Sequence, residues 1–257
     1  MSLIPQDRQG NSLGVGAGAE ADLLRVAAQQ TKAASRLDHR VGSGSVEVRV
    51  PVRAGEAGGG IRVLNASPDL PVLDVYVDGS RAFSAVGYGQ LTDYVRLAKG
   101  SHTVTVYEAA GAGGKPLAEV TVNLRRDQEY TIAVLGRAEH TETLTIKDST
   151  PPALPGRVRI RMLNLVPGPP MDVSIKGLWD LFRNVSYKEI TGYAETATGT
   201  VDLQFAVAGG KAPVMTIDDY RLAPGGRYTL IVLGRNRHAA ASRVLPVADR
   251  VRPSDST

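Results

Sequence analysis

Three aspartates in one short segment are the residues best suited to acid–base or metal chemistry. Asp69, Asp74 and Asp78 lie in the segment SPDLPVLDVYVDG, and on a β-strand Asp74 and Asp78 would point to the same side. Such carboxylates can act as general acid and base or supply oxygen ligands to a hard cation. A calcium site needs six or more oxygens, however, and Asp78-Gly79 is also typical of a hairpin turn. Asp172 stands in the place of Asp74 in a second, similar segment, which favours a structural hydrogen-bonding role.

The histidines and glycine-rich segments give no stronger candidate. No two of the four histidines, His39, His102, His140 and His238, have the i, i+4 spacing of a helical zinc pair. The segment GVG at 14–16 lacks the preceding strand of a dinucleotide site, and GAGGKP at 111–116 departs from a phosphate-binding loop. We therefore predict no catalytic residue, no cofactor and no metal. An enzyme would have to use the three aspartates and His102 alone.

Composition argues against two classes of partner. Thirty basic and 26 acidic residues give a net charge of +4, and the arginines are scattered among strand-like runs. A nucleic-acid-binding protein would concentrate its basic residues on one face, so no nucleic-acid partner is expected. No apolar run approaches the ~20 residues of a transmembrane helix, so no membrane span is expected. The opening MSLIPQDRQGNS lacks the pattern of a secretory signal, which leaves open whether a signal was removed.

The candidate residues lie in a sequence that repeats itself. RVLNASPDLPVLDVYVDG at 62–79 matches RMLNLVPGPPMDVSIKG at 161–177, and several tyrosines, threonines and glycines follow in the same order. Matches in order over about 75 residues indicate duplication. The proline-containing DSTPPALPGR at 148–157 separates the copies. The predicted organisation is a flexible lead with a helix and an edge strand at 1–56, a first module at 57–150 and a second at 151–257.

Within each copy the pattern is that of strands. Runs such as VLDVYVDG, HTVTVYE, AEVTVNL and YTIAVLG are rich in Val, Ile, Tyr and Thr, and turn residues separate them. Six or seven short strands per copy predict an all-β protein of two tandem antiparallel β-sandwich modules of Ig-like, Greek-key type. A short helix is expected at 19–40 and an extra strand at 45–53, confined to a sheet edge by Pro51.

A repeated spacing of leucine and tyrosine predicts a folding staple. Leu124 precedes Tyr130 by six residues in LRRDQEY, and Leu222 precedes Tyr228 by six in LAPGGRY. This is the spacing of a tyrosine corner, in which the phenol binds backbone a few residues upstream and fixes the crossover between two sheets. The alternative is that both tyrosines contact a ligand.

These segments resemble a bacterial family of unknown function, the domain-of-unknown-function family numbered 4397. RVLNASPDLPVLDVYVDG, YGQLTDYVRLAKGSHTVTVY and YTIAVLG carry the resemblance in the first copy, and NVSYKEITGY and PGGRYTLIVLG carry it in the second. It covers roughly residues 61–147 and 158–248 and brings no catalytic residues. It implies tandem β-sandwich modules at bacterial surfaces, in envelopes or in spore-associated settings, and hence an extracytoplasmic location. In the second copy Gly168 and Lys176 replace Asp69 and Asp78, so a role for those two acids would belong to the first module alone.

The predicted function is non-enzymatic and consists of binding or structural assembly. Residues 45–53 could pair with a sheet edge of a neighbouring molecule by β-augmentation, or could instead cap their own module. The alternative function is that of a carbohydrate- or polysaccharide-binding adaptor, with a hydrolytic enzyme as a further alternative. The possible ligand contacts are Tyr76, Tyr107, Tyr220 and Asp74.

Overall fold

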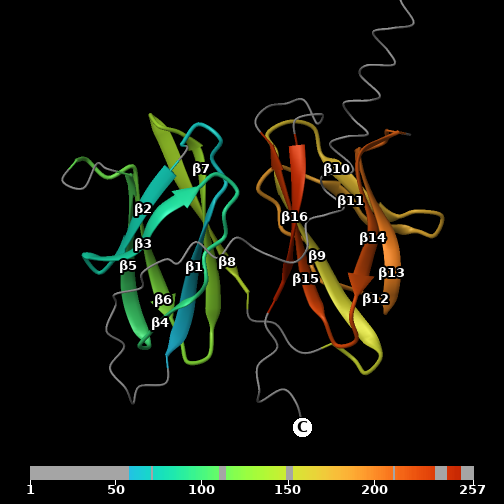
Figure 1. Ribbon diagram of the computed structural model, residues 1–257, viewed down its shortest axis with the longest axis horizontal. Coiled ribbons are helices and arrows are strands. Elements are labelled where there is room, and N and C mark those ends of the chain that lie inside the picture. Colours follow the sequence, from blue (N-terminus) through green and yellow to red (C-terminus); the bar gives the residue numbers. More distant parts are fainter. Residues whose placement is uncertain are drawn as a thin grey trace, which may run out of the picture. The chain divides into compact units, whose positions relative to one another are not determined.

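The described part of the chain consists of β-strands joined by turns and loops (Figure 1). A computed structural model describes residues 58–70, 72–109, 114–148, 153–210, 212–234 and 242–249, and these are called the described residues. The helix predicted at 19–40 and the strand predicted at 45–53 lie outside them. All described residues belong to one compact unit, Val41–Thr257.

The first module contains eight strands in two four-stranded sheets. Its strands are β1 (Gly59–Asn65), β2 (Val72–Val77), β3 (Ser80–Gly87), β4 (Val95–Leu97), β5 (Gly100–Glu108), β6 (Ala118–Leu124), β7 (Glu129–Arg137) and β8 (His140–Lys147). One sheet has the order β4-β1-β7-β8 and the other the order β3-β2-β5-β6.

The second module repeats this arrangement. Its strands are β9 (Arg157–Leu165), β10 (Met171–Ile175), β11 (Asp180–Val185), β12 (Ala194–Ala197), β13 (Gly199–Val207), β14 (Pro213–Leu222), β15 (Arg227–Gly234) and β16 (Ser242–Ala248). The sheets are β12-β9-β15-β16 and β11-β10-β13-β14, which is the strand order of the first module. The prediction of an all-β protein is confirmed. Each module has eight strands, not six or seven, because strands as short as β4 and β12 are too brief to show a period in sequence.

The sheets are not wholly antiparallel, which corrects the prediction. β1 runs parallel to β7, with Ile61 opposite Tyr130, and β9 runs parallel to β15, with Ile160 opposite Tyr228. A parallel pair of strands requires a long connection. Here β7 and β15 follow the first strand of their module only after the chain has crossed several times between the two sheets. Side-chain alternation is the same in parallel and antiparallel strands, so the sequence pattern did not distinguish them.

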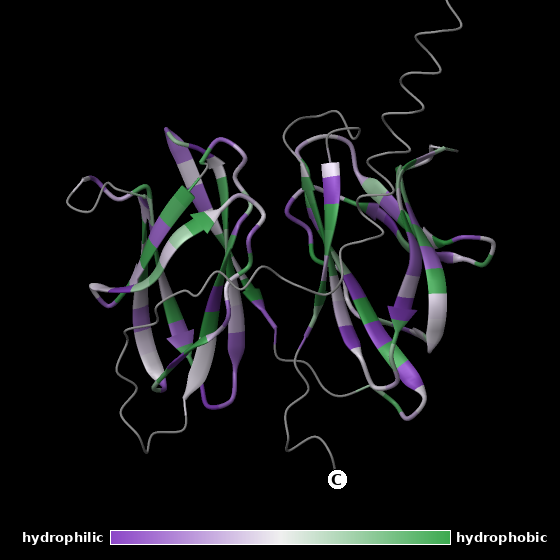
Figure 2. Cartoon of the chain, in the orientation of Figure 1, coloured by the Kyte–Doolittle hydropathy of each residue, from purple (hydrophilic) through white to green (hydrophobic). Residues whose placement is uncertain are grey.

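Each module has an apolar core between its two sheets. In the first module Ile61, Val63 and Ile132 of one sheet pack with Val75 and Val104 of the other, all fully buried. The second module has the equivalent cluster around Ile160, Leu203, Phe205, Leu230 and Val232. Apolar residues recur along strands of all four sheets (Figure 2).

A third apolar cluster lies between the modules. It includes Leu64, Leu135 and Ile146 of the sheet β4-β1-β7-β8 together with Leu163 and Leu233 of the sheet β12-β9-β15-β16. These are the inner sheets, and β3-β2-β5-β6 and β11-β10-β13-β14 are the outer sheets. Because each inner sheet is covered on both faces, every residue of β1 and of β15 is buried.

Candidate functional site at the junction of the two modules

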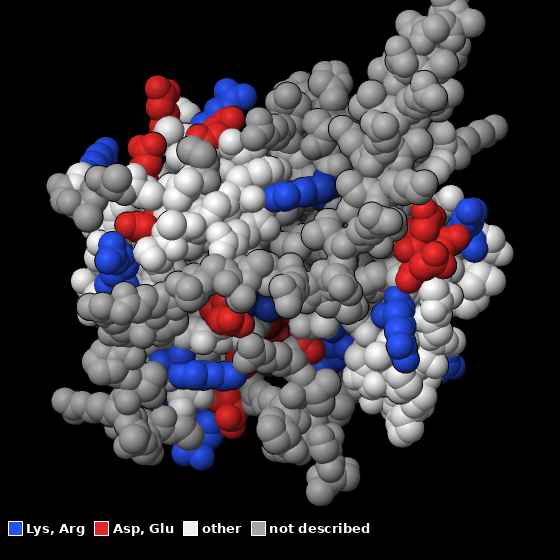
Figure 3. Space-filling view, in the orientation of Figure 1, with Lys and Arg blue, Asp and Glu red and all other residues white. Residues whose placement is uncertain are grey.

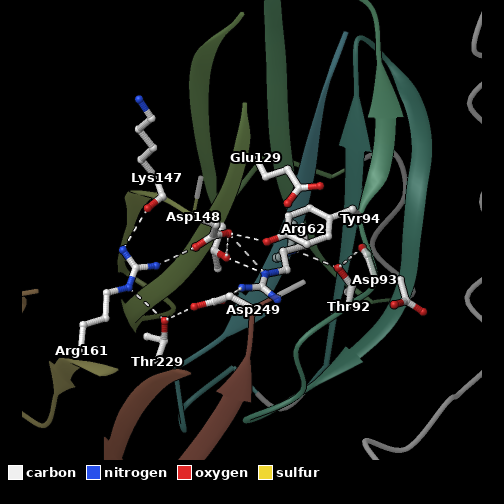
Figure 4. Close-up of polar contacts among 12 residues, drawn as sticks. Arg62, Thr92, Asp93, Tyr94, Glu129, Lys147, Asp148, Arg161, Thr229 and Asp249 are labelled. Carbon is white, nitrogen blue, oxygen red and sulfur yellow. Dashed lines mark hydrogen bonds and ion pairs between the residues drawn. The ribbon is translucent and has the colours of Figure 1, made fainter. Parts of the chain in front are cut away.

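The junction is the surface through which the two inner sheets meet. Its apolar part is the third cluster, in which residues of β1, β7 and β8 pack against residues of β9, β15 and β16. Beside this cluster lies a set of buried charged and hydroxyl-bearing side chains (Figure 4). These side chains are called the junction network.

Arg62, on β1, joins the first module to the second. Its Nε donates to Oγ1 of Thr131 at 2.7 Å and lies 3.4 Å from Oδ2 of Asp148. Its Nη2 donates to Oδ1 of Asp249, in the second module, at 3.2 Å. The guanidinium carbon lies 4.6 Å from the centroid of the Tyr94 ring, a cation–π distance. One arginine therefore binds carboxylates of both modules.

Arg161, at the equivalent place on β9, makes the reciprocal contacts. Its Nε donates to Oγ1 of Thr229 at 2.9 Å, and its Nη2 donates to Oδ1 of Asp148 at 3.1 Å. Its Nη1 donates to the backbone carbonyl of Lys147 at 3.0 Å. The guanidinium carbon lies 4.8 Å from the centroid of the Tyr193 ring. The two modules thus exchange arginines, each supplying the cation for the other's aspartate.

Each carboxylate also accepts hydrogen bonds from hydroxyl groups of its own module. The donors are Tyr94 (2.7 Å) and Thr131 (2.5 Å) to Oδ2 of Asp148, and Tyr193 (3.1 Å) and Thr229 (2.8 Å) to Oδ2 of Asp249. Asp148 directly follows β8, and Asp249 directly follows β16. The network is therefore duplicated along with the fold.

Burial changes the protonation equilibria of the network. It raises the pKa of the Tyr94 and Tyr193 phenols, and the neighbouring carboxylates Asp148 and Asp249 raise it further. It also raises the pKa of the Asp249 carboxyl, against the opposing effect of Arg62. Burial alone would lower the pKa of Arg62, but Asp148, Tyr94 and Asp249 outweigh it and the pKa is raised. The phenols stay protonated as donors, and two arginines face two aspartates.

The chemistry open to this site is mutual neutralisation. The side chains of Arg62, Asp148, Asp249 and Arg161 are 3–8% exposed in their ion pairs. A buried ion pair gains little net stability over apolar packing, but the loss of one partner leaves an uncompensated charge and is costly. The exchanged contacts form only when the two inner sheets meet in this arrangement.

The sequence contains a signal for the junction network in its repeated arginines and threonines. Arg62 and Arg161 stand at equivalent positions of RVLN and RMLN, and each is flanked on both sides by apolar residues, in IRVL and IRML. Apolar runs are typical of strands buried on both faces, where a charge requires a partner. Thr131 and Thr229 recur in the matching YTIAVLG and YTLIVLG segments.

The staple predicted in the second module has a backbone partner. The Tyr228 hydroxyl accepts a hydrogen bond from the backbone N–H of Ala223 at 2.9 Å, and Leu222 is buried in the second core. A Cβ on Gly226 would come within 2.6 Å of the Tyr228 ring, so the ring lies directly on this turn. We propose that Tyr228 fixes the connection between β14 and β15.

The equivalent tyrosine of the first module makes a different contact. Tyr130 is half-buried, and its hydroxyl donates to Oε1 of Gln128 at 2.6 Å. Leu124 is buried in the first core. Asp127 has a φ of +60° in this turn, where the second module has Gly225 at +71°. Tyr130 thus bonds a side chain where Tyr228 bonds the backbone.

Two of the tyrosines predicted to contact a ligand form a pair on the first outer sheet. Tyr76 of β2 and Tyr107 of β5 are both half-buried, with ring centroids 5.2 Å apart at 76°, an edge-to-face contact. They lie on the face opposite to Val75 and Val106, which belong to the first core. Each ring therefore meets the other on the outward face of this sheet.

Tyr220, the third tyrosine predicted to contact a ligand, faces the second core. It is half-buried, packs against the second core, and its ring centroid lies 5.7 Å from that of Tyr228. A bulge causes this, because Val201 pairs with Tyr220 while Leu203 pairs with Ile217, so β14 contains one extra residue. The extra residue reverses the alternation and turns Tyr220 inward.

Asp74 and its counterpart Asp172 each support a bulge between two strands. Oδ1 of Asp74 accepts the backbone N–H of Ala85 at 2.9 Å, and Oδ1 of Asp172 accepts that of Asn184 at 2.6 Å. Ala85 and Asn184 have φ values of +54° and +56°, a conformation that non-glycine residues seldom adopt. Oδ2 of Asp172 also accepts the N–H of Gly209 at 3.1 Å.

The remaining predicted acids contact separate partners. Asp69 lies 3.5 Å from Nε of Arg137 in an exposed ion pair. Oδ2 of Asp78 lies 2.7 Å from Nδ1 of His102, and its Oδ1 accepts the backbone N–H of Thr103 at 2.9 Å. Within the described ranges, no three His, Asp or Glu side chains are grouped so as to hold a metal ion.

Comparison with known proteins gives a family. Residues 59–174 and 160–257 match the family described as "Domain of unknown function (DUF4397)". No curated protein matches the chain. Among solved structures, the fimbrial anchor protein Mfa2 from Porphyromonas gingivalis is 12% identical and has a TM-score of 0.22, with 75% of this chain and 97% of that chain covered. A likeness this low carries no argument about function. The two matches together span both modules, and the chain belongs to the DUF4397 family, of which it carries two copies.

Proposed function

We propose that the protein is a non-enzymatic β-sandwich protein of the bacterial cell surface or envelope, and that it acts by binding or structural assembly. The observation that carries the proposal is the junction, where a shared apolar cluster and exchanged arginine–aspartate contacts join the modules. Because the inner sheets face each other at the junction, the outer sheets lie away from it. The extracytoplasmic location rests on what the resemblance of the repeated segments to the DUF4397 family implies.

The use of the polar side chains supports a structural role. The junction carboxylates Asp148 and Asp249 neutralise arginines, and Asp74 and Asp172 accept backbone N–H groups at bulges. The imidazole of His102 lies between Asp78 and the carbonyl of Ala98. These carboxylates and this imidazole bind other parts of the fold, as is expected of polar side chains with a structural role.

The distribution of charge supports a partner other than nucleic acid. On the face shown in Figure 3, the basic and acidic side chains of the described residues are interspersed. A nucleic-acid-binding surface would gather lysines and arginines along one stripe. None of the described residues forms a helix that could span a membrane.

Assembly through residues 45–53 can be tested by deletion. The full chain and a variant lacking residues 1–56 are compared by light scattering after size exclusion. If these residues pair with a neighbouring molecule, the full chain forms species larger than a monomer and the deletion variant is monomeric. A full chain that is monomeric at all concentrations would contradict assembly. Capping of its own module would instead appear as a lower melting temperature of the deletion variant.

The location is tested separately, in a bacterium that carries the gene. An epitope-tagged full chain is followed through cell fractionation and through protease treatment of intact cells. The proposal predicts recovery with the envelope and, at the surface, cleavage without lysis. Recovery in the cytosolic fraction alone would overturn the location.

A further inference from the structure

The outer sheet of the second module carries a hollow of about 670 Å³. It lies over β10, β11 and β13 and extends to the turn at Gly209 and Gly210. The polar side chains that line it are Asp172, Ser174, Asp180, Arg183, Asn184 and Gln204. A volume of this size is in the range of small-molecule sites, but such sites are usually lined by apolar groups. A polar lining therefore indicates a polar ligand.

In the first module two tyrosine rings lie at the equivalent place. In the second module Ser174 lies opposite Gln204, and Asp172 lies opposite Ala206. The same register in the first module places Tyr76 opposite Thr105, and Asp74 opposite Tyr107. The edge-to-face pair of Tyr76 and Tyr107 thus occupies the outward face that Ser174 and Ala206 leave open. The two modules share the bulge and the aspartate here, but of the two only the first carries the aromatic pair.

The floor of the hollow holds hydrogen-bonding groups in fixed positions. The Asp172 carboxylate is oriented by the N–H groups of Asn184 and Gly209, at 2.6 and 3.1 Å, and each oxygen retains a further lone pair. Ser174 and Gln204 face each other across the strands, and neither side chain has a hydrogen-bond partner among the described residues. These two side chains can each donate and accept a hydrogen bond.

The charge of the hollow selects against ionic ligands. Asp172 and Asp180 carry two negative charges, and Arg183 is bound to Asp180, with Nε donating to Oδ2 at 2.7 Å. An anion would meet the two carboxylates. A cation would have to compete with the N–H groups and the guanidinium that these carboxylates already bind. A neutral ligand with several adjacent hydroxyl groups matches both the acceptors and the donors.

We infer that the hollow binds a neutral saccharide, with Asp172 accepting from ligand hydroxyls and Ser174 and Gln204 donating and accepting. This inference rests on the proposed binding function and names its ligand class. It places the ligand in the second module, whereas Tyr76 and Tyr107 lie on the outer sheet of the first module and Tyr220 packs against the second core.

The test uses the full chain and an array of neutral oligosaccharides built from glucose, galactose, mannose and N-acetylglucosamine, with sialylated and uronic-acid glycans as charged probes. A hit is then measured by titration calorimetry. The variant Ser174→Tyr with Ala206→Tyr rebuilds the tyrosine pair of the first module, and its fold is checked by circular dichroism. We expect binding to weaken by about tenfold or more, because two rings would occupy the ligand's place.

The matched control makes the opposite exchange in the first module, Tyr76→Ser with Tyr107→Ala, and should leave the affinity of the hollow in the second module unchanged. The inference is overturned if no neutral oligosaccharide binds, if only charged glycans bind, or if the rebuilt tyrosine pair leaves binding intact. Those outcomes would leave the assembly and location experiments untouched, so the failure of the ligand class is distinguishable from failure of the proposed function.

Discussion

The guanidinium of Arg62 donates a hydrogen bond to Asp249 at 3.2 Å, although 187 residues separate them in the chain. Arg161 returns the contact to Asp148 at 3.1 Å. The junction is therefore self-complementary, in the manner of a symmetric dimer interface, except that a single chain supplies both halves. Its consequences can be measured by stability, pH dependence and cooperativity.

Removal of one arginine from the junction network should be strongly destabilising. In Arg62→Met the aliphatic volume is largely kept, but Asp148 and Asp249 lose a buried cation. We expect the free energy of unfolding in urea at neutral pH to fall by roughly 3–5 kcal/mol. A second change, Asp249→Asn in the Arg62→Met background, should restore part of this loss because it removes the unpaired charge.

The control for this variant is Arg137→Met. Arg137 pairs with Asp69 at 3.5 Å, with side chains that are 82% and 55% exposed. Its removal should change the free energy of unfolding by about 0–1 kcal/mol. Equal losses in the two arginine variants would contradict the role of the network.

Stability should fall at alkaline pH because of the three phenols whose pKa is raised most. Burial raises the pKa of Tyr94, Tyr193 and Tyr220 in the folded state, whereas an unfolded chain has the ordinary value near 10. An acid whose folded pKa is raised contributes stability that is fully present below the unfolded pKa and is lost as pH rises above it. Each phenol therefore contributes a loss of up to about 1.4 kcal/mol per pH unit above about pH 10.

This alkaline loss is measured as the urea midpoint from about pH 9 to about pH 11, together with phenolate absorbance. The double variant Tyr94→Phe, Tyr193→Phe should show a shallower decline, because two of the three phenols are gone. A midpoint that is independent of pH over this range in the parent chain would disprove the prediction.

The two predicted staples should differ in strength. Tyr228→Phe removes the acceptor of the Ala223 N–H, and we expect a loss of about 1–3 kcal/mol. Tyr130→Phe removes only the bond from a half-buried phenol to the Gln128 side chain, so a loss of about 0.5–1.5 kcal/mol is expected. Urea unfolding of the two variants gives the comparison. A larger loss for Tyr130→Phe would place the stronger staple in the first module.

The shared cluster at the junction should make the modules unfold together. Trp179 is the one tryptophan of the chain and lies in the second module, between β10 and β11, so its fluorescence reports on that module. Leu73→Ala creates a cavity in the first core and should lower stability by roughly 2–5 kcal/mol. If unfolding is cooperative, the Trp179 transition shifts by the same amount.

Leu203→Ala, in the core of the second module, is the control, since it must shift the Trp179 transition directly. Independent modules would be revealed by a Trp179 transition that moves in Leu203→Ala but stays in place in Leu73→Ala. That result would contradict a rigid junction.

Local sequence patterns predicted the strands, but they did not predict bulges or the relative direction of paired strands. The segment containing Asp74 and Tyr76 alternates as a strand with one inward face, and this interpretation agrees with the burial of Val75 and Val77. Strand alternation alone does not give the orientation of Tyr220, because a bulge in β14 inserts a residue before it. The direction of β1 relative to β7 was likewise absent from the pattern, since a strand has the same period in either direction.

The sequence by itself determined that the chain is a duplicated all-β protein. Strand period, turn residues and repeated motifs are local features of the sequence, and they occur in both copies. Only the tertiary structure decided that Arg62 binds Asp249, that Arg161 binds Asp148, and that Ser174 and Ala206 open a hollow that Tyr76 and Tyr107 fill in the first module. The physical reason is that pairing of buried charges and filling of space depend on which surfaces meet. Those surfaces are brought together by contacts between residues far apart in the chain.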